Sequence, residues 1–448
     1  MDLGALIFSR KLNVTGITIE QPSISILQNP AGSWNYSSLG SKTAPAPQAQ
    51  AKNESAAASS NLDLSVKLIK IDKGRLVLGK TDSKLKPEVL DNVNVEVRDL
   101  SANSAFPFSM TASATGGAQL KLNGTAGPLN PTDTAATPLN ASLNVSHLDL
   151  AHSGFLPPTD FAGLVSIDGS LNSAGQKALV KGNVKADQLV LAKGGSPAKK
   201  QVAFDFELEH DLQKHSGELL RGNIHVGAAV ASLTGTYHSE GESTIVNMKL
   251  QSPGMAIPEL EAMLPALDIV LPSGSSLQGG TAKIDVTASG PTDRLVLDGS
   301  AGLNNTRLAG FDLGNRMSLV TKLAGIKNGP NTEIQNFSSN LHSDAQGIRA
   351  DNISLIAPEV GELSGGGTIS PVHALDFKMT ANLHTGGVLV VIGSKTTVPF
   401  RIGGTSSNPK FEPDVKGIVE QKLKGLEGGE AGKAAEGVIK GLFGGKKN

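Results

Sequence analysis

Regular alternation of apolar and polar residues is the sequence feature that most constrains the fold of this 448-residue chain. Between positions 375 and 383 every odd position is apolar and every even position is polar. Successive side chains of a β-strand point to opposite faces of a sheet, so this segment predicts a strand with one apolar and one polar face. Other alternating segments carry apolar residues at Val93, Val95 and Val97; at Leu139, Ala141, Leu143 and Val145; at Val202, Phe204, Phe206 and Leu208; and at Ile284, Val286 and Ala288.

Turn signals separate these segments, for example Gly-Gly-Ser-Pro at 194–197 and Asn-Gly-Pro at 328–330. Glycine supplies 52 residues, more than the roughly 7% of average proteins. Frequent turns between short strands favour antiparallel neighbours. We therefore predict a mainly β fold, an extended, curved, mostly antiparallel sheet forming a groove-like repeating array, with few short helices.

Two segments have helical signals. The first runs from Pro258 to Leu267, with apolar residues on one side and Pro265 expected to kink or end it. The second lies in the C-terminal tail, where 415–426 is amphipathic and is followed by glycines. This stretch could lie on a membrane surface or cover a sheet end, and the glycines favour the cover or an unfolded tail.

Composition changes divide the chain into four parts. Residues 41–61 are rich in Ala, Pro, Ser and Gln and predict a flexible linker. It separates N-terminal strands within 1–40 from a β body over 62–413, and a Gly- and Lys-rich tail follows over 414–448. Within the body, six identities recur at an offset of 117, which indicates a sheet extended by similar strands. They pair Gly163, Ile167, Asp168, Gly182, Leu191 and Ala192 with Gly280, Ile284, Asp285, Gly299, Leu308 and Ala309.

Charge, cysteine and hydropathy exclude several protein classes. Forty basic and 41 acidic residues nearly cancel, whereas nucleic-acid binding needs a basic excess, so we expect no nucleic-acid partner. The absence of cysteine excludes disulfides and thiolate chemistry. No stretch reaches the roughly 18–20 apolar residues of a membrane helix.

Catalytic and metal motifs are missing or incomplete. The histidine pairs His147/His152 and His210/His215 are spaced by five, which places paired rings on opposite faces of a strand. The segment 428–433 is one residue too short for a phosphate loop, and no Gly-x-Ser-x-Gly elbow occurs. Carboxylates are scattered along polar strand faces. We therefore expect no enzyme activity, no metal and no cofactor.

The two ends of the chain carry its most specific motifs. At the start, a strand-like stretch over 14–26 with Pro22 leads to Gly32-Ser33-Trp34-Asn35-Tyr36, and a second strand-like stretch follows over 68–78. At the end, two strand-like stretches cover 398–404 and 408–414. These motifs resemble the first and last strands of the AsmA family of bacterial envelope proteins, whereas the middle of the chain is similar to that family in its general pattern and has no specific motif.

The resemblance implies a location and a function. Relatives are anchored in the inner membrane by an N-terminal helix and extend into the periplasm, in a fold similar to chorein-type bridge proteins that carry lipid. We therefore expect an envelope protein that moves phospholipid between membranes and supports outer-membrane assembly, with components of both membranes as partners. Met1 enters the family's pattern partway, with no anchor helix before it, so we expect a truncated or misassigned start.

The alternation suggests how lipid would be held. An apolar sheet face must be covered, and helices and aromatic side chains are both scarce here, so acyl chains are a natural filler. The predicted groove consists of apolar positions that act collectively. They are Val93, Val95, Val97, Leu139, Ala141, Leu143, Val145, Phe204, Phe206, Leu208, Ile284, Val286, Leu375, Phe377, Met379, Ala381 and Leu383.

Two other functions fit the same pattern. The first is a closed β-sandwich scaffold or adhesin of the envelope that transports no lipid. The second is a β-helical carbohydrate-active enzyme, which would need a convergent pair of carboxyl groups. An interior that is dry and free of lipid would identify the scaffold. A convergent carboxyl pair would identify the enzyme.

Overall fold

The computed structural model describes residues 11–29, 33–36, 63–81, 87–130, 136–153, 161–240, 243–317, 329–383 and 397–414. The fold class is as predicted: the chain is mainly β, its strands are mostly antiparallel, and its helices are few and short. The chain forms two compact units, unit 1 (1–248 and 265–268) and unit 2 (249–264 and 269–448). The expected linker and C-terminal helix lie outside the described residues, and the range expected as one β body contains the boundary between the units.

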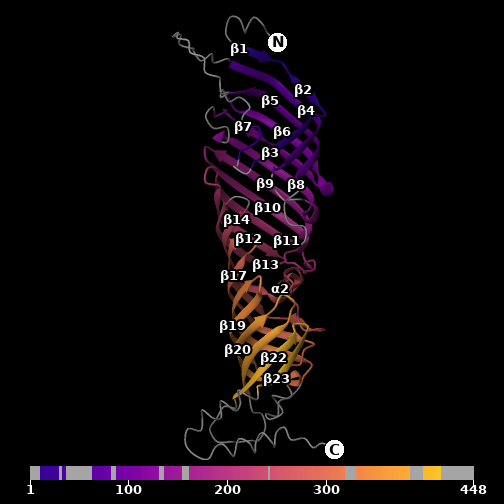
Figure 1. The fold of residues 1–448 in the computed structure, drawn as a ribbon, viewed down its shortest axis with the longest axis vertical. Helices are drawn as coiled ribbons and strands as arrows, with labels where there is room; N and C mark the ends of the chain where they lie inside the picture. The colour runs from indigo at the N-terminus through magenta and orange to yellow at the C-terminus, as the bar shows by residue number, and fades with distance from the viewer. Residues whose placement is uncertain are drawn as a thin grey trace, which may run out of the picture. The chain divides into compact units, whose positions relative to one another are not determined.

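Unit 1 is a sheet whose strands from β4 onward follow one another in chain order, and Figure 1 shows its ribbon coloured from indigo to magenta. From β4 to β13 every strand pairs antiparallel with the next. The short 3₁₀ turns η1 (Thr115–Gly117) and η3 (Leu150–His152) follow β6 and β8, and strand β14 (Ser243–Ala256) crosses the unit boundary. The strands are β1 (Lys11–Val14), β2 (Ile17–Glu20), β3 (Ser23–Gln28), β4 (Asp63–Lys80), β5 (Glu88–Ser101), β6 (Phe106–Ala114), β7 (Gln119–Ala126), β8 (Leu139–Asp149), β9 (Ala162–Ala174), β10 (Lys177–Val190), β11 (Val202–Asp211), β12 (Ser216–Val226) and β13 (Ala229–Glu240).

The first three strands form one edge of unit 1 and run parallel to β4. All three have the same register, because each residue pairs with the β4 residue 52 positions later. Along β3 the outer backbone is occupied by Asn35, whose Nδ2 donates to the Ser25 carbonyl (2.8 Å) and whose Oδ1 accepts from the Leu27 N–H (3.1 Å). The Asn35 N–H also donates to the Leu27 carbonyl (2.8 Å). These bonds keep another strand from pairing with β3.

Bulges interrupt the registers of both units at residues with left-handed backbone. Lys73, Asn92, His147, Gln188 and Asn352 each have a φ between 49° and 60° and lie where strand pairing shifts. A bulge adds a residue to one strand and increases its local twist. Repeated bulges therefore supply the curvature that a long antiparallel sheet needs.

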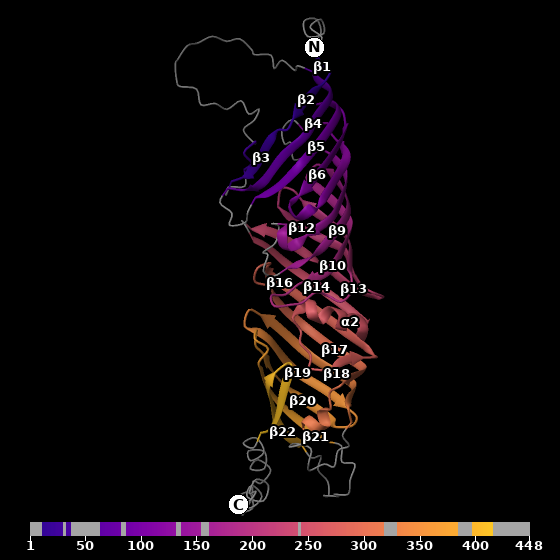
Figure 2. The same ribbon diagram turned by 90° about the vertical axis from the view of Figure 1, so that its right-hand side faces the viewer.

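Unit 2 contains a second antiparallel series in which each strand from β17 to β22 pairs with the next, and Figure 2 shows its later strands in orange and yellow. Its first helix is α2 (Ile257–Met263), which confirms the helix expected from Pro258. The 3₁₀ turn η4 (Leu264–Leu267) follows in the chain, and its residues 265–267 belong to unit 1. Helix α3 (Leu313–Arg316) is one turn long. The strands are β15 (Ser276–Gln278), β16 (Thr281–Pro291), β17 (Val296–Ala309), β18 (Asn331–Asp344), β19 (Gly347–Ala357), β20 (Gly361–Ile369), β21 (Leu375–Leu383), β22 (Thr397–Thr405) and β23 (Asn408–Pro413).

Among the described strands β23 pairs only with β22, and prolines occupy two of its three outward-facing positions. The Asp414 N–H bonds to the Pro399 carbonyl of β22 (3.0 Å), so N–H groups of alternate residues point inward. Positions 409, 411 and 413 then face outward, and Pro409 and Pro413 have no N–H. This edge is poorly suited to accept a further strand.

The sequence repeat corresponds to one hairpin in each unit. Strands β9 and β10 pair Asp168 with Asn183, and β16 and β17 pair Asp285 with Ser300, which is the same register shifted by 117. Gln188 and Asn305, also 117 apart, both have left-handed φ values. The six identities thus mark a structural repeat.

Candidate functional site

The strand registers of unit 1 align its apolar residues into continuous rows. Directly opposite residues of antiparallel strands have side chains on the same face. Three rows cross the sheet on one face, and we call the first the central row. The central row is Ile71, Val95, Met110, Leu122, Leu143, Gly169, Gly182, Phe206 and Gly222. One flanking row is Ile69, Val97, Phe108, Gly124, Ala141, Leu171, Val180, Leu208 and Leu219, and the other is Leu120, Val145, Ile167, Val184, Phe204, Ile224 and Ala231.

Many large side chains in these rows are only half-buried. Among the predicted groove residues of unit 1, three are buried, and these pack within the sheet: Val93, Ala141 and Val145 are 4%, 5% and 7% exposed. The others retain accessible surface on the apolar face. They are Val95, Val97, Leu139, Leu143, Phe204, Phe206 and Leu208. The structure therefore brings the predicted positions of unit 1 together on one partly uncovered face.

Phenyl rings on this face lie across glycines of neighbouring strands. A Cβ on Gly182 would be 2.8 Å from Phe206 Cζ, and one on Gly124 would be 3.0 Å from Phe108 Cζ. Phe204 and Phe206 stack on each other with their centroids 5.5 Å apart. The rings thus cover bare backbone along the sheet. These glycines belong to the site, although an alternation pattern that counts only apolar side chains does not include them.

The opposite face of unit 1 is polar, and ion pairs and side-chain hydrogen bonds link its neighbouring strands. Glu207 lies 3.1 Å from Lys181 Nζ and 3.6 Å from Arg221 Nη2, and Asn183 Nδ2 donates to Asp205 Oδ1 (2.6 Å). Each pair joins adjacent strands, and exposed pairs of this kind each contribute only about 0–1 kcal/mol. This face is suited to contact with water.

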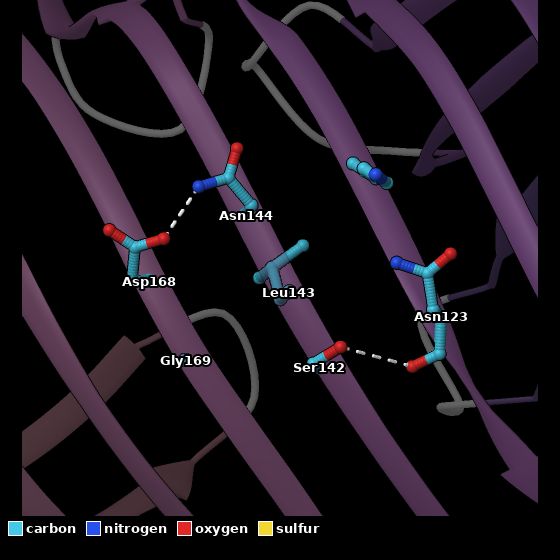
Figure 3. A pocket seen from close by; sticks show the side chains of 7 residues that line it. Asn123, Ser142, Leu143, Asn144, Asp168 and Gly169 are labelled. Atoms are coloured by element: carbon cyan, nitrogen blue, oxygen red, sulfur yellow. Dashed lines mark hydrogen bonds between the residues drawn. The ribbon is translucent and has the colours of Figure 1, made fainter.

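A shallow hollow of about 400 Å³ opens on the polar face over β7, β8 and β9. Figure 3 shows Asn144 Nδ2 bonded to Asp168 Oδ1 (2.5 Å) and Ser142 bonded to the Asn123 carbonyl. Leu143 and Gly169 also line it. The alternation nevertheless directs the Leu143 side chain to the other face, and it would direct a side chain at position 169 there too. The hollow is therefore separate from the apolar rows.

The histidine pairs do not form a shared site. His147 and His152 are both exposed, and His152 Nδ1 bonds to Asp149 (2.8 Å). His210 stacks on Tyr237, while His215 lies in a turn. Within the described ranges, no three His, Asp or Glu side chains gather as metal ligands.

In unit 2 the predicted groove residues have two different environments. Ile284, Val286 and Leu375 are half-buried. Phe377, Met379 and Ala381 are 9%, 6% and 0% exposed and belong to a packed core. Leu383 belongs to β21, and its side chain lies outside the description.

The core of unit 2 is closed by the segment 311–317, which contains α3. Phe311, Leu313 and Met317 are 6%, 6% and 0% exposed and pack on the apolar face of β19–β22. The buried Thr332 holds this segment, because its hydroxyl donates to the Phe311 carbonyl (2.7 Å) and accepts from the Leu313 N–H (3.0 Å). Asp312 caps the helix through the Asn315 N–H (2.8 Å).

Aromatic contacts complete this cover. Phe411 lies 6.3 Å from Phe400 and 6.4 Å from Phe311, centroid to centroid, and the Arg316 guanidinium lies over the Phe311 ring. The apolar face of unit 2 is therefore filled by protein where the three central β21 residues lie. We call 311–317 the covering segment.

Helices of the described ranges are all too short or too polar to span a membrane. No family model matches the chain. The curated proteins contain no match, and neither do the solved structures.

Proposed function

We propose that the apolar face of unit 1 binds the acyl chains of phospholipid without catalysing a reaction. The observation that carries the proposal is the alignment of three apolar rows in register, with seven predicted residues only half-buried. Large apolar patches that keep accessible surface mark a binding surface or an aggregation hazard in soluble proteins. An acyl chain supplies cover without requiring directional bonds.

The expected binding strength follows from apolar burial. Each methylene removed from water contributes about 0.8 kcal/mol, so a lipid with two long chains gains many such contributions. Neighbouring positions of the rows present similar aliphatic surfaces, which keeps the cost of moving along them low. This combination favours a conduit over a tight storage site.

We further propose that the chain acts as an AsmA-type envelope protein, passing phospholipid between membranes in support of outer-membrane assembly. The resemblance of 14–36 and of 398–414 to that family supports this location and role. The first segment contains β2 and β3, and its Asn35 occupies the edge of β3, while the second contains most of β22 and all of β23.

The second candidate is a closed scaffold without lipid. The packed core beneath the covering segment favours it, because part of the predicted groove is already filled by side chains. The two candidates differ in what covers the apolar face of unit 1. A scaffold would leave no apolar ligand on the purified protein.

The test compares two adjacent residues of β9 that point to opposite faces. Leu171 lies in an apolar row, and Ser170 is exposed on the polar face opposite Lys181. We expect Leu171→Asp to remove phospholipid detected by native mass spectrometry and lipid extraction, because it places a charge among methylenes. Ser170→Asp should retain it, since the new carboxylate lies near a lysine. Equal lipid content in the two variants, or none in the wild type, would contradict the proposal.

A further inference from the structure

Gly169 lies in the middle of β9 and interrupts the central row. Its direct partners are Leu143 on β8 and Gly182 on β10. The row therefore lacks two adjacent side chains. Gly182 is covered by the Phe206 ring, but a Cβ on Gly169 would meet only one atom within 4 Å, the Lys181 carbonyl oxygen at 3.4 Å.

The backbone does not require glycine at this position. Gly169 has no left-handed φ, and 3.4 Å is an ordinary van der Waals contact. Other glycines on these strands differ, since a Cβ on Gly124 would lie 2.2 Å from the Asn140 carbonyl and one on Gly299 would lie 2.1 Å from the Asp285 carbonyl. Those two positions exclude any side chain by clash. Gly169 would tolerate one.

A glycine inside a strand weakens it, because glycine has high backbone entropy and no side chain to pack. Where neither φ nor a close contact explains it, an interior glycine often marks the approach of another group. Here the empty position is bordered by Ile167 and Leu171 on its own strand and by Leu143 on the next. All three belong to the apolar rows. The vacant space is therefore an apolar recess one side chain wide.

The repeated hairpin of unit 2 provides an internal comparison. The residue 117 positions after Gly169 is Val286, which lies opposite Gly299 just as Gly169 lies opposite Gly182. Val286 is half-buried and fills the equivalent position. Gly169 therefore distinguishes the hairpin of unit 1 from its repeat.

We propose that Gly169 is a seat for an acyl chain of bound phospholipid, whose methylenes occupy the space of the missing side chain. This inference rests on the proposed function and adds the position at which the chain makes its closest approach to the backbone. Gly169 is then a specificity-determining residue, since any side chain there displaces methylenes from the recess.

The test uses the absence of cysteine, which makes one introduced thiol unique. Gly169→Cys and Ser170→Cys are prepared in the full chain, freed of lipid, and labelled with a water-soluble maleimide. Labelling is repeated with vesicles of phosphatidylethanolamine and phosphatidylglycerol. With lipid at about ten times its Kd, the Gly169→Cys thiol should react about tenfold more slowly, whereas the Ser170→Cys thiol should keep its rate.

A filling variant provides a second measurement that does not depend on thiol chemistry. Gly169→Leu should lower the number of phospholipids that copurify with each chain while retaining the circular dichroism spectrum, and Ser170→Leu should leave that number unchanged. If lipid did not slow labelling of the Gly169→Cys thiol, although lipid still bound and was still lost in Leu171→Asp, an acyl chain would not lie at Gly169. The proposed function would then remain intact. Absence of bound lipid from every variant and from the wild type would overturn both.

Discussion

The two units share one pattern of alternation but cover their apolar faces differently. In unit 1 the rows that cross β4–β13 keep half-buried valine, leucine and phenylalanine side chains. In unit 2 the covering segment buries the equivalent face over β19–β22, and Phe400 is 1% exposed. The comparison shows that alternation specifies which face is apolar but not what covers it. In unit 2 a segment of seven residues, together with the contacts of Phe411, supplies that cover.

The largest expected effect tests the energetic side of this difference. Phe400→Ala removes a fully buried ring and should cost about 3–5 kcal/mol of the free energy of unfolding of unit 2. Phe206→Ala removes a half-buried ring from unit 1 and should cost roughly 1–2 kcal/mol, since less area leaves water on folding.

Urea unfolding followed by two signals separates the units. Far-ultraviolet circular dichroism reports all strands, and the fluorescence of Trp34, the single tryptophan, reports unit 1. We expect Phe400→Ala to move the circular dichroism transition more than the fluorescence transition. Equal costs for the two phenylalanine variants would mean that the faces are equally well packed, and the comparison would fail.

The second prediction concerns attachment of the covering segment. Thr332→Val keeps the shape of a buried side chain but leaves the Phe311 carbonyl and the Leu313 N–H without their partner, at a cost of about 1–3 kcal/mol. Hydrogen exchange should then accelerate in 311–317. Thr332→Ser retains the hydroxyl and should exchange nearly as the wild type does. Unchanged exchange in the valine variant would show that apolar packing alone holds the segment.

The smallest expected effect tests whether the two faces of unit 2 act independently. His342 lies on β18, with Nδ1 2.7 Å from Asp298 Oδ1 and Nε2 3.6 Å from Asp344 Oδ2. The bond to Asp298 raises the pKa of His342, although partial desolvation and nearby Arg349 act in the opposite direction.

A raised folded-state pKa gives a stabilisation that is complete below the ordinary histidine pKa of about 6.5 and is lost as pH rises through the folded value. The melting temperature difference between wild type and His342→Gln should therefore be positive at pH 5.5 and shrink by pH 8.5. Hydrogen exchange in 311–317 should not change between the two proteins. A pH-dependent change there would show that the polar face influences the cover.

Period-two alternation located five strands, β5, β8, β11, β16 and β21, and the residues of each that share a face, because a strand has only two faces. The helix at Pro258 was also predictable, since proline early in an apolar-periodic segment is a local signal. The cover of Phe377 was not, because 311–317 is too short to show a periodicity and its burial depends on Thr332, which follows 15 residues later. Gly169 was missed because a glycine carries no hydropathy signal. The bulges were missed because alternation of hydropathy does not reveal an extra residue, and because Lys73 and Gln188, unlike Asn92, His147 and Asn352, are not residue types typical of left-handed backbone.

The hairpin repeat has a consequence for how a gene of this kind can change in length. A two-strand insertion returns the chain to the side from which it started, so the following strands keep their direction, register and inward residues. A one-strand insertion reverses every later strand, and a one-residue insertion exchanges the two faces until a bulge absorbs it. The hairpin is thus the smallest heritable unit of growth, and β9–β10 and β16–β17, which lie 117 residues apart in the chain, share one internal register.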